Sequence, residues 1–282
     1  MRLTGAVVVV TGGAGGIGTA LARRFAAEQA TAVVVADLDR AAAERVASQC
    51  SGLGMGVDVT DEDQVRHLVD TVLDRYGRID LFCSNAGVTT GAGVDADPVE
   101  WARAWNVNVM AHVYAARAVL PSMLARGSGY LLQTCSAAGL LTAVGDAPYT
   151  VTKHAAVGFA EWLAITYGDR GIRVSAVCPQ GVRTPMLTDG LAAGHVAARV
   201  TAAGGEILEP EQVAEAVVEG LAEERFLILP HPEVAEYVRR KATDPDRWLT
   251  AMRRLSASQS PARSQSPAGS QSPAPGGEAS DG

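Results

Sequence analysis

The chain has 282 residues, of which 48% are hydrophobic, and a formal net charge of −7. This suffices for one sizeable core, and no run of Lys and Arg indicates a nucleic acid or an anionic membrane as a partner. No apolar run approaches the roughly 20 residues that span a bilayer, and no signal peptide precedes the first strand. The widely spaced cysteines suggest reduced, buried thiols rather than a zinc site, so we expect a cytoplasmic protein without a metal. They are Cys50, Cys83, Cys135 and Cys178.

Short apolar runs alternate with segments of helical periodicity from the N-terminus onwards. The runs are continuously apolar and rich in β-branched residues, which is typical of buried parallel strands. Their alternation with helices predicts an α/β fold, with a Rossmann-type doubly wound parallel sheet in a three-layer α/β/α arrangement. The predicted strands are Ala6–Val10, Thr31–Ala36, Gly54–Val57, Ile79–Ser84, Tyr130–Thr134 and Arg173–Cys178. The predicted helices are about Thr19–Gln29, Arg40–Gln49, Asp61–Tyr76, Trp101–Leu124 and Tyr149–Tyr167.

The alternation breaks after Pro179. Residues Met186–Gly205 are rich in Ala, Gly and Thr, which predicts a mobile flap over a cleft. A helix at Pro210–Glu224, a last strand at Phe226–Leu229 and a charged helical stretch at Glu233–Leu255, interrupted at Pro245, are expected to follow.

The end of the chain has a different composition. The motif Ser-Gln-Ser-Pro-Ala recurs there and offers nothing apolar to bury. We therefore expect a single domain over residues 1–255 and a disordered Ser/Gln/Pro-rich tail over 256–282. A tail phosphorylated at Ser-Pro is the functional alternative.

A glycine-rich turn joins the first strand to the first helix. Two overlapping patterns, G-x-G-x-x-G and T-G-x-x-x-G-x-G, lie between Thr11 and Gly18. Glycines let the backbone approach a pyrophosphate, and the N-terminus of the following helix adds favourable partial charge. With a strand before it, a helix after it and an acid further on, the turn predicts a dinucleotide site rather than a merely flexible turn. The expected contacts are Gly12, Gly16, Ile17 and Gly18.

The ends of the second and third strands predict which dinucleotide binds. Asp37 ends the second strand, where a carboxylate accepts both hydroxyls of the adenosine ribose and repels a 2′-phosphate. Leu38 rather than Arg follows, so we expect NAD over NADP; we interpret Arg40 as a solvated charge of the next helix. Asp58, followed by Val59, either accepts from the adenine amino group or caps the following helix.

Tyr149 and Lys153 lie one helical turn apart, so both side chains leave the same helix face. A free tyrosine has a pKa of about 10, and a pKa near 7 requires about 4 kcal/mol. A cation about 4 Å away supplies roughly that energy at an effective dielectric constant of about 20. Ser136, upstream in the chain, is a candidate to hold a substrate oxygen near the phenol. By themselves, the two residues are more typical of an exposed helical pair, and the rest of the chain overturns that interpretation.

With Thr11–Gly18, Asn85-Ala86-Gly87, Asn108, Ser136, Tyr149 and Lys153 in this order, the chain resembles the short-chain dehydrogenase/reductase family in its compact, single-domain branch. The resemblance extends from about Arg2 to Met186. It implies an NAD(P)-dependent alcohol dehydrogenase or carbonyl reductase.

The resemblance also implies a role for each catalytic residue. Tyr149 would act as general base towards a secondary alcohol, and Ser136 would steady the substrate oxygen. Lys153 would bind the nicotinamide ribose and lower the pKa of Tyr149, helped by the positive charge of the oxidised nicotinamide. Asn108 resembles the family's helix-kink residue that holds a water for a proton relay. An Asn that merely bonds the backbone is the alternative for this position, and Asn106 is the nearby rival.

Two further segments are assigned by the resemblance. The backbone of Asn85, Ala86 and Gly87 would lie beside the adenosine ribose, with Asn85 tying neighbouring strands. The turn from Pro179 to Thr184 resembles the family's Pro-Gly-x-Val-x-Thr turn, apart from an inserted-looking Gln180. In that turn Pro179, Val182 and Thr184 would contact the nicotinamide, and the last two would clamp its carboxamide.

The expected substrate is a small apolar secondary alcohol or ketone. The residues predicted to bind it are Ser136, Leu140, Val144, Tyr149, Met186 and Leu187, with Leu141 and Leu191 as further candidates. No cluster of Arg or His accompanies them to hold a phosphate or a carboxylate. Some of these apolar residues are alternatively ordinary members of the core.

Assembly and two rival functions complete the expectations. Phe226–Pro232 replaces the Gly-rich last strand of many tetrameric relatives, so we expect a homodimer through the two long helices and leave a tetramer open. A catalytically silent NAD-binding regulator is the first rival, against which the intact catalytic set argues. A sugar-nucleotide epimerase or dehydratase of the extended branch is the second, but its kind carries a larger C-terminal substrate domain.

Overall fold

The computed structural model describes residues 1–259, and the predicted tail lies outside the described residues from 260 onwards. Its centre is a seven-stranded sheet in the order β3-β2-β1-β4-β5-β6-β9, with every pair of neighbours parallel. The strand order reverses between β1 and β4, so the predicted doubly wound fold is confirmed. The strands are β1 Val7–Thr11, β2 Ala32–Asp37, β3 Leu53–Gly56, β4 Leu81–Ser84, β5 Gly129–Thr134, β6 Ile172–Val177 and β9 Leu227–Ile228.

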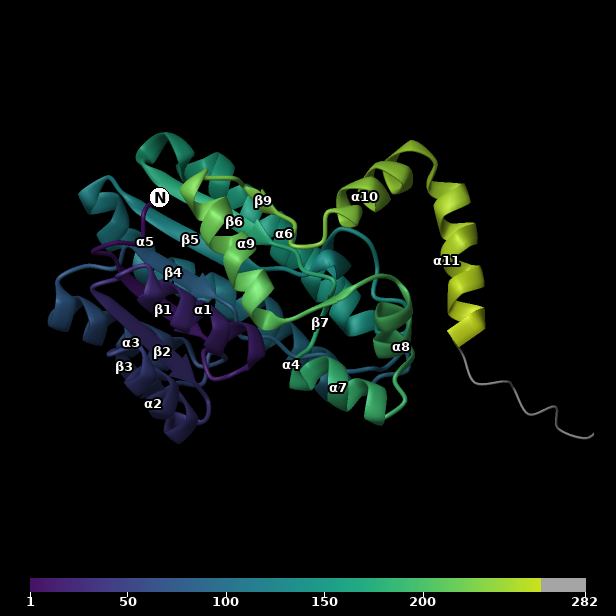
Figure 1. Cartoon of the computed structure of the whole chain (residues 1–282), viewed down its shortest axis with the longest axis horizontal. Helices are drawn as coiled ribbons and strands as arrows, with labels where there is room; N and C mark the ends of the chain where they lie inside the picture. Colours follow the sequence, from purple (N-terminus) through teal and green to yellow (C-terminus); the bar gives the residue numbers. More distant parts are fainter. Residues whose placement is uncertain (260–282) are drawn as a thin grey trace, which may run out of the picture.

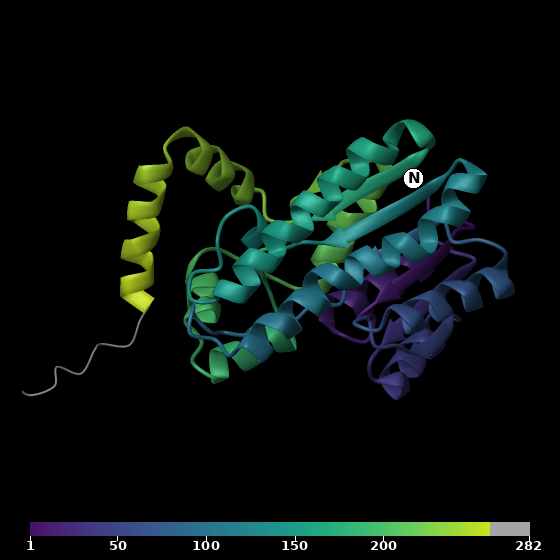
Figure 2. The same cartoon turned by 180° about the vertical axis from the view of Figure 1, so that it is seen from behind.

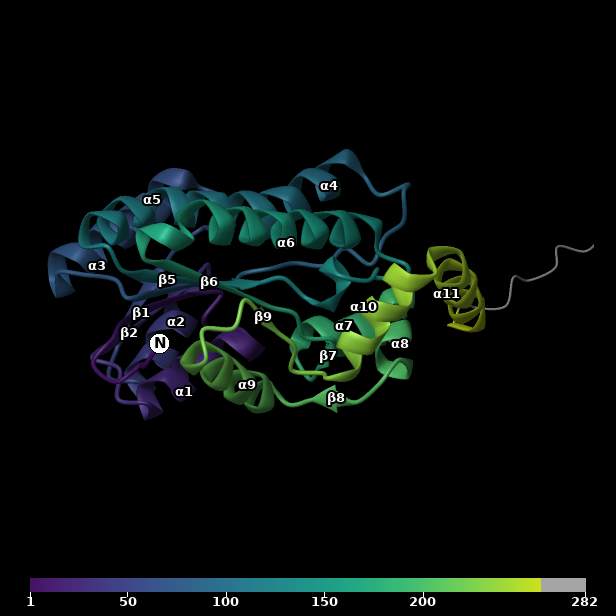
Figure 3. The same ribbon diagram turned by 90° about the horizontal axis from the view of Figure 1, so that it is seen from above.

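Helices cover both faces of the sheet and form the outer layers of the sandwich (Figure 3). Alternate residues of β1 explain why its sequence is continuously apolar: Val7 and Val9 pack into one core, whereas Val8 and Val10 pack into the other. One face carries α3 (Glu62–Tyr76), α5 (Ala111–Arg126) and α6 (Ala147–Tyr167). The opposite face carries α1 (Gly16–Ala27), α2 (Arg40–Gln49) and α9 (Pro210–Ala222).

The long helix predicted from Trp101 contains a π-helical segment. It consists of α4 (Pro98–Trp105), the π segment Asn106–Met110, and then α5. Such segments bend a helix and occur often at functional sites. Asn108 lies inside it, fully buried, which agrees with the kink expected there. Figure 2 shows α5 running beside α6, so the π segment lies close to the helix that carries Tyr149.

Four helices of the C-terminal part, α7, α8, α10 and α11, lie beyond the carboxyl end of the sheet (Figure 1). The segment predicted as a flap forms two short helices, α7 (Pro185–Ala192) and α8 (Val196–Ala203). A small parallel pair, β7 (Gly181–Val182) and β8 (Ile207–Leu208), was not predicted, because two-residue strands show no periodicity.

The C-terminal helical stretch is broken next to Pro245, as predicted. It consists of α10 (Glu233–Thr243) and α11 (Pro245–Gln259). Because α11 continues past Leu255, the start of the expected tail at residue 256 falls inside a helix. The division into one domain and a disordered tail otherwise stays a prediction.

Candidate active site

A cavity of about 1330 Å³ opens where the central strands end. Open α/β sheets bind ligands at this edge, outside the carboxyl ends of the strands where the strand order reverses. The residues predicted to contact the cofactor all line this cavity. They are Gly12, Gly16, Ile17, Gly18, Asp37, Leu38, Asp58, Val59, Asn85, Ala86, Gly87, Tyr149, Lys153, Pro179, Val182 and Thr184.

Three glycines of the turn, Gly12, Gly16 and Gly18, have no room for a side chain. Gly12 has a φ of +59°, and a Cβ there would lie 2.7 Å from Cα of Ala86. A Cβ on Gly16 would lie 2.6 Å from Cγ2 of Thr184, and one on Gly18 only 2.1 Å from the carbonyl oxygen of Gly12. No side chain caps the start of α1, and its first turn carries no acid. The turn and the helix end therefore fit a pyrophosphate, which accepts from backbone N–H groups.

The two acids at the adenosine end occupy different positions. Asp37 is held at the glycine-rich turn, because Ala14 N–H donates to its Oδ2 at 3.0 Å. Asp58 accepts from both the N–H and the hydroxyl of Thr60. The helix-capping alternative for Asp58 is wrong, since Asp61 caps α3 instead. Arg40 is exposed and pairs with Glu44, as expected for a solvated charge.

Asn85 joins neighbouring strands, as the resemblance implied. Its side-chain amide donates to the carbonyl oxygens of Thr11 and Gly12, both at 3.1 Å. Its Oδ1 accepts from the hydroxyl of Thr134 at 3.2 Å. The ends of β1, β4 and β5 are thereby fixed relative to one another beneath the cavity.

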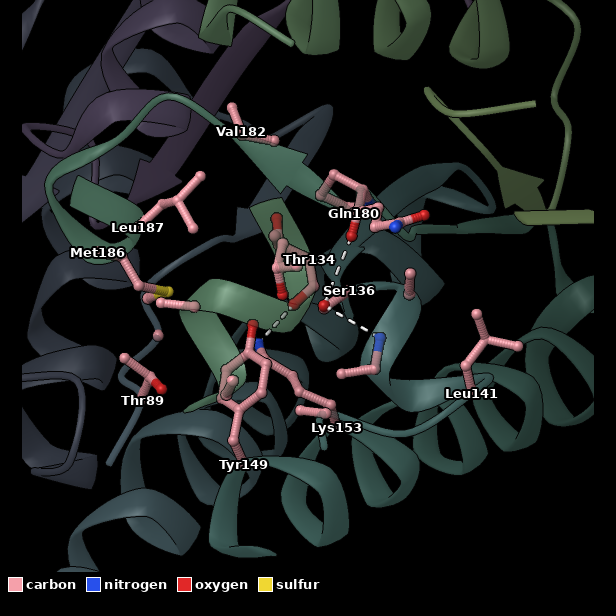
Figure 4. Close-up of a pocket in the computed structure, with 18 of the residues that line it drawn as sticks. Thr89, Thr134, Ser136, Leu141, Tyr149, Lys153, Gln180, Val182, Met186 and Leu187 are labelled. Atoms are coloured by element: carbon pink, nitrogen blue, oxygen red, sulfur yellow. Dashed lines mark hydrogen bonds between the residues drawn. The ribbon is translucent and has the colours of Figure 1, made fainter. Parts of the chain in front are cut away.

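Tyr149, Lys153 and Ser136 converge at the far end of the same cavity (Figure 4). Lys153 Nζ lies 5.6 Å from the centre of the Tyr149 ring and donates to the carbonyl oxygen of Thr134 at 2.9 Å. Lys153 is 2% exposed, and no carboxylate pairs with it among residues 1–259. The exposed-pair interpretation of these two residues is therefore wrong.

Ser136 has a strained backbone. Its φ of +79° and ψ of 149° lie in a region that is essentially reserved for glycine, at a cost of about 1–3 kcal/mol. Its hydroxyl accepts from Ala138 N–H at 3.2 Å. Such strain concentrates at active sites, where it aims a side chain that relaxed geometry would not aim.

Asp146 is a site residue that the sequence analysis missed. Its buried carboxylate caps α6 by accepting from Tyr149 N–H at 3.0 Å. It also accepts from the hydroxyl groups of Thr89 and Thr90 and from the N–H groups of Thr90 and Gly91. Asp146 thus fixes the first turn of the catalytic helix to the loop after β4. An Asp just before Ala-Pro at a helix start was the local signal for this cap.

The pKa of Tyr149 differs from the expectation. Burial raises it to about 12, the Ser136 hydroxyl opposes this, and the charge of Asp146 adds to the rise. Burial also lowers the pKa of Lys153. Burial therefore raises the pKa of Tyr149 by more than the neighbouring charge of Lys153, inferred from the sequence spacing, lowers it.

Asn108 does not line the cavity. Its side-chain amide donates to Val88 O at 2.9 Å and to Thr152 Oγ1 at 3.0 Å, and its Oδ1 accepts from Val88 N–H at 2.9 Å. Both amide protons are used, so the backbone-bonding alternative describes this side chain. A relay water held by Asn108 stays a prediction.

The comparisons with known proteins agree with this geometry. A family model described as short chain dehydrogenase matches residues 6–193. A 1-deoxy-11-beta-hydroxypentalenate dehydrogenase of Streptomyces exfoliatus is 38% identical over 243 residues, which cover 83% of this chain and 86% of that protein. The chain belongs to the short-chain dehydrogenase/reductase family.

Two further relatives of this family extend the comparison. A meso-2,3-butanediol dehydrogenase of Serratia marcescens is 34% identical over 218 residues, covering 76% of this chain and 86% of that protein. A crystal structure of a short-chain dehydrogenase/reductase from Burkholderia phymatum, in complex with NAD, superposes with a TM-score of 0.80 at 28% identity. It covers 87% of this chain and 96% of that chain. The chain is therefore an oxidoreductase of this family.

The far wall of the cavity in this short-chain dehydrogenase corrects two expectations. Leu141, Val144, Met186 and Leu187 line the cavity, but Leu140 and Leu191 do not. Leu140 packs instead against the hydrophobic clusters beneath it, and Leu191 is 37% exposed. Leu140 differs from Leu141 because it ends the short 3₁₀-helix after Ser136, whereas Leu191 lies near the end of α7.

The two C-terminal helices provide lining residues that the sequence analysis missed. Lys241 of α10 donates to the carbonyl oxygens of Leu140 and Leu141 and thereby fastens α10 to the loop after Ser136. The next helix, α11, also lines the cavity and contacts α8 (Figure 1). The lining residues of α10 include Tyr237, Arg239 and Arg240; those of α11 include Arg247, Trp248, Ala251, Met252 and Leu255.

His112 is a buried titratable group behind Lys153. It is 1% exposed and has no well-formed hydrogen bond. Burial, reinforced by the charge of Lys153, lowers the pKa of His112 to about 3, and the Gln133 amide opposes this. The imidazole is therefore neutral at physiological pH.

His112 is expected to make stability depend on pH. Below pH 6.5, the ordinary pKa of histidine, His112 binds a proton in the unfolded chain but not in the folded protein. The free energy of unfolding therefore decreases as the pH falls from about 6.5 towards 3. Between pH 7 and pH 5 the loss amounts to about 2 kcal/mol. Urea unfolding at pH 7 and pH 5 should show that the free energy of unfolding of His112→Leu lacks this decrease. Equal pH dependence in both proteins would contradict it.

No helix among residues 1–259 is both long and apolar enough to cross a membrane. Within the same residues, no three His, Cys, Asp or Glu side chains gather in a way that could bind a metal ion.

Proposed function

We propose that this oxidoreductase uses NAD to interconvert an apolar secondary alcohol and its ketone, with Tyr149 as general acid and base. The observation that carries the proposal is the meeting of Tyr149, Lys153 and Ser136 in one cavity with a glycine-lined cradle that ends at Asp37. The names of the two dehydrogenase relatives, which refer to a hydroxypentalenate and a butanediol, support an alcohol as substrate.

The chain's own residues provide binding, orientation and a proton path. The nicotinamide, when bound, supplies hydride exchange and, in its oxidised form, a positive charge. Lys153 donates one of its three protons to Thr134 O, which leaves two for ribose hydroxyls and the phenol. Tyr149 takes the proton of an alcohol or returns it to a ketone oxygen, while the strained Ser136 holds that oxygen. Val182 and Thr184 would hold the carboxamide.

The pKa of Tyr149 decides what else this mechanism needs. A phenol with a pKa of about 12 is a competent acid for ketone reduction but a scarce phenolate near neutral pH. Alcohol oxidation therefore requires positive charge beside the phenol, which we assign to Lys153 and the oxidised ring together.

The experiment that tests the proposal is a turnover screen. Purified protein is incubated with NAD or NADP and a panel of steroids, aliphatic alcohols and cyclic diols, and reduced cofactor is followed by absorbance. We expect turnover with NAD on an apolar member. A protein that binds NAD but turns over no member would support the silent-regulator alternative. One that keeps its NAD bound through turnover would support the epimerase alternative.

We propose that the substrate is bulky as well as apolar, because α11 brings four apolar side chains to the cavity. Arg247 of the same helix and Arg239 and Arg240 of α10 line the cavity too, which corrects the expectation that no Arg cluster lies near the substrate. Trp248, Ala251, Met252 and Leu255 recur at helical spacing and all line the cavity. They complete an enclosure with Leu141, Val144, Met186 and Leu187. A small alcohol would leave much of this apolar surface in water.

Removing Trp248 should separate large from small substrates. Trp248→Ala is expected to lower kcat/KM about tenfold or more for a polycyclic alcohol and to change it little for 2-butanol, because only the larger molecule reaches α11. Leu249→Ala is the matched control, since Leu249 lies on the same helix, is 55% exposed and does not line the cavity. Equal losses for both alcohols would contradict the enclosure.

We propose a homodimer through the outer faces of α4 and α6. Large apolar side chains are exposed there: Trp162 at 52%, Ile165 at 82%, Val151 at 47% and Val99 at 71%. Phe159 stacks on Trp162, which adds to this apolar surface. A surface of this kind is typical of an interface.

Ile165→Glu is expected to produce a monomer, since it places a charge in the proposed interface while disturbing no core contact. Sedimentation velocity measures the outcome, with Leu249→Glu as the control that stays dimeric. A wild-type monomer, or a dimeric Ile165→Glu, would contradict this mode of assembly.

We also place the protein in the cytoplasm, which is supported by four free cysteines and can be checked by cell fractionation.

A further inference from the structure

His231 lies between two prolines in the segment that joins β9 to α10. It is 1% exposed, and both ring nitrogens are hydrogen-bonded. Gln180 N–H donates to Nδ1 at 3.1 Å, and Nε2 lies 3.1 Å from the carbonyl oxygen of Gly181. A donor faces Nδ1 and an acceptor faces Nε2, so the ring proton resides on Nε2.

One imidazole thus holds two peptide groups of the turn from Pro179 to Thr184, which are separated by the peptide between Gln180 and Gly181. The first peptide is fixed at both ends, because the carbonyl oxygen of Pro179 accepts from Ala137 N–H at 2.8 Å while Gln180 N–H binds His231. The second peptide contains the carbonyl group of Gly181 and the N–H of Val182. This peptide is planar and trans, so the two groups point in opposite directions.

The direction of Val182 N–H follows from that geometry. Because His231 binds the Gly181 oxygen, it turns Val182 N–H away from itself. Val182 and Thr184 line the cavity, whereas His231 does not. The end of the turn is held separately, by Arg183 N–H donating to Leu208 O at 2.9 Å. The imidazole, together with the pairing of Gly181 and Val182 with Ile207 and Leu208 of β8, therefore fixes the part of the turn that directs the Val182 donor.

We propose that His231 is a positioning residue for the nicotinamide half of the cofactor. It acts through the turn and touches neither cofactor nor substrate. The inference rests on the proposed function, in which Val182 and Thr184 hold the carboxamide. It also gives a role to the Phe226–Pro232 segment, which departs from the Gly-rich ending of many relatives.

The test compares two ligands that differ only at the nicotinamide. NADH carries the ring, whereas ADP-ribose carries the adenosine, the pyrophosphate and a second ribose without it. His231→Leu leaves Gln180 N–H and the Gly181 oxygen without their buried partner. We expect it to weaken NADH binding about tenfold and to leave ADP-ribose binding unchanged, as measured by calorimetry.

A conservative variant separates positioning from mere support of the fold. The amide of Gln offers one acceptor and one donor at a spacing close to that of Nδ1 and Nε2. His231→Gln should therefore recover most of the NADH affinity and of kcat.

Three results would overturn the inference. One is unchanged NADH affinity and kcat in His231→Leu; another is an equal loss of NADH and ADP-ribose binding, which would make His231 a general support of the fold. The third is wild-type protein that binds NADH no more tightly than ADP-ribose. Wild-type protein that binds neither ligand would instead refute the proposed function, and the inference would fall with it.

Discussion

Tyr149→Phe is expected to lower kcat about 10³-fold and to leave NAD affinity nearly unchanged. General acid–base groups contribute roughly 10²–10⁴-fold, and this substitution removes the only atom of Tyr149 that exchanges a proton. We propose that nucleotide binding depends on the glycine-rich turn, Asp37 and Asn85, none of which contacts the Tyr149 hydroxyl in the described hydrogen bonds. Steady-state turnover and calorimetry measure the two effects separately.

Tyr237→Phe is the matched control for that experiment. Tyr237 lines the same cavity and packs against Trp248, so it loses the same atom at a position without a catalytic partner. Its turnover should stay close to that of the wild type. Near-wild-type turnover in Tyr149→Phe would remove Tyr149 from the mechanism.

Asp37→Asn is expected to reduce the preference for NAD over NADP by about tenfold or more, measured as the ratio of the two kcat/KM values. The carboxylate of Asp37 is held at the turn by Ala14 N–H and would repel a 2′-phosphate. The amide keeps the size and an acceptor oxygen but loses the charge. NAD should bind less well, because a charged acceptor forms the stronger bonds to ribose hydroxyls.

Asp39→Asn tests whether that effect is specific to position 37. Asp39 lies two residues further on, caps α2 by accepting from Ala42 N–H, and does not line the cavity. It should leave the cofactor ratio unchanged. A wild-type protein that already prefers NADP, or an Asp37→Asn protein with an unchanged ratio, would contradict the assignment.

The sheet and the cofactor cradle could be predicted because their signals are local. Strands buried on both faces need continuous apolar runs, and the turn after β1 needs glycine, since Cβ atoms at Gly16 and Gly18 would clash with neighbouring atoms. The pairing of Tyr149 with Lys153 follows from a single helical turn. The resemblance implied a kink at Asn108, but the π segment itself was not predicted, since no local periodicity marks it.

The remaining features depend on contacts between distant segments. Asp146 joins α6 to the loop after β4, and His231 binds a turn far upstream in the chain. The apolar stripe of α11 is visible in the sequence, but its position over the cavity depends on the Lys241 anchor. Sequence spacing also underestimated the cost of burial, which raises the pKa of Tyr149 instead of lowering it.

Transfer of deuterium from substrate to cofactor tests the central claim most directly. An alcohol from the screen that supports turnover, or the bulkiest cyclic members if none does, is deuterated at its carbinol carbon and incubated with the protein and NAD. We predict reduced cofactor that carries the deuterium, detected by mass spectrometry, and about 10³-fold less of it with Tyr149→Phe. Reduced cofactor without the label, or none at all from a protein saturated with NAD, would contradict a hydride-transferring dehydrogenase at this site.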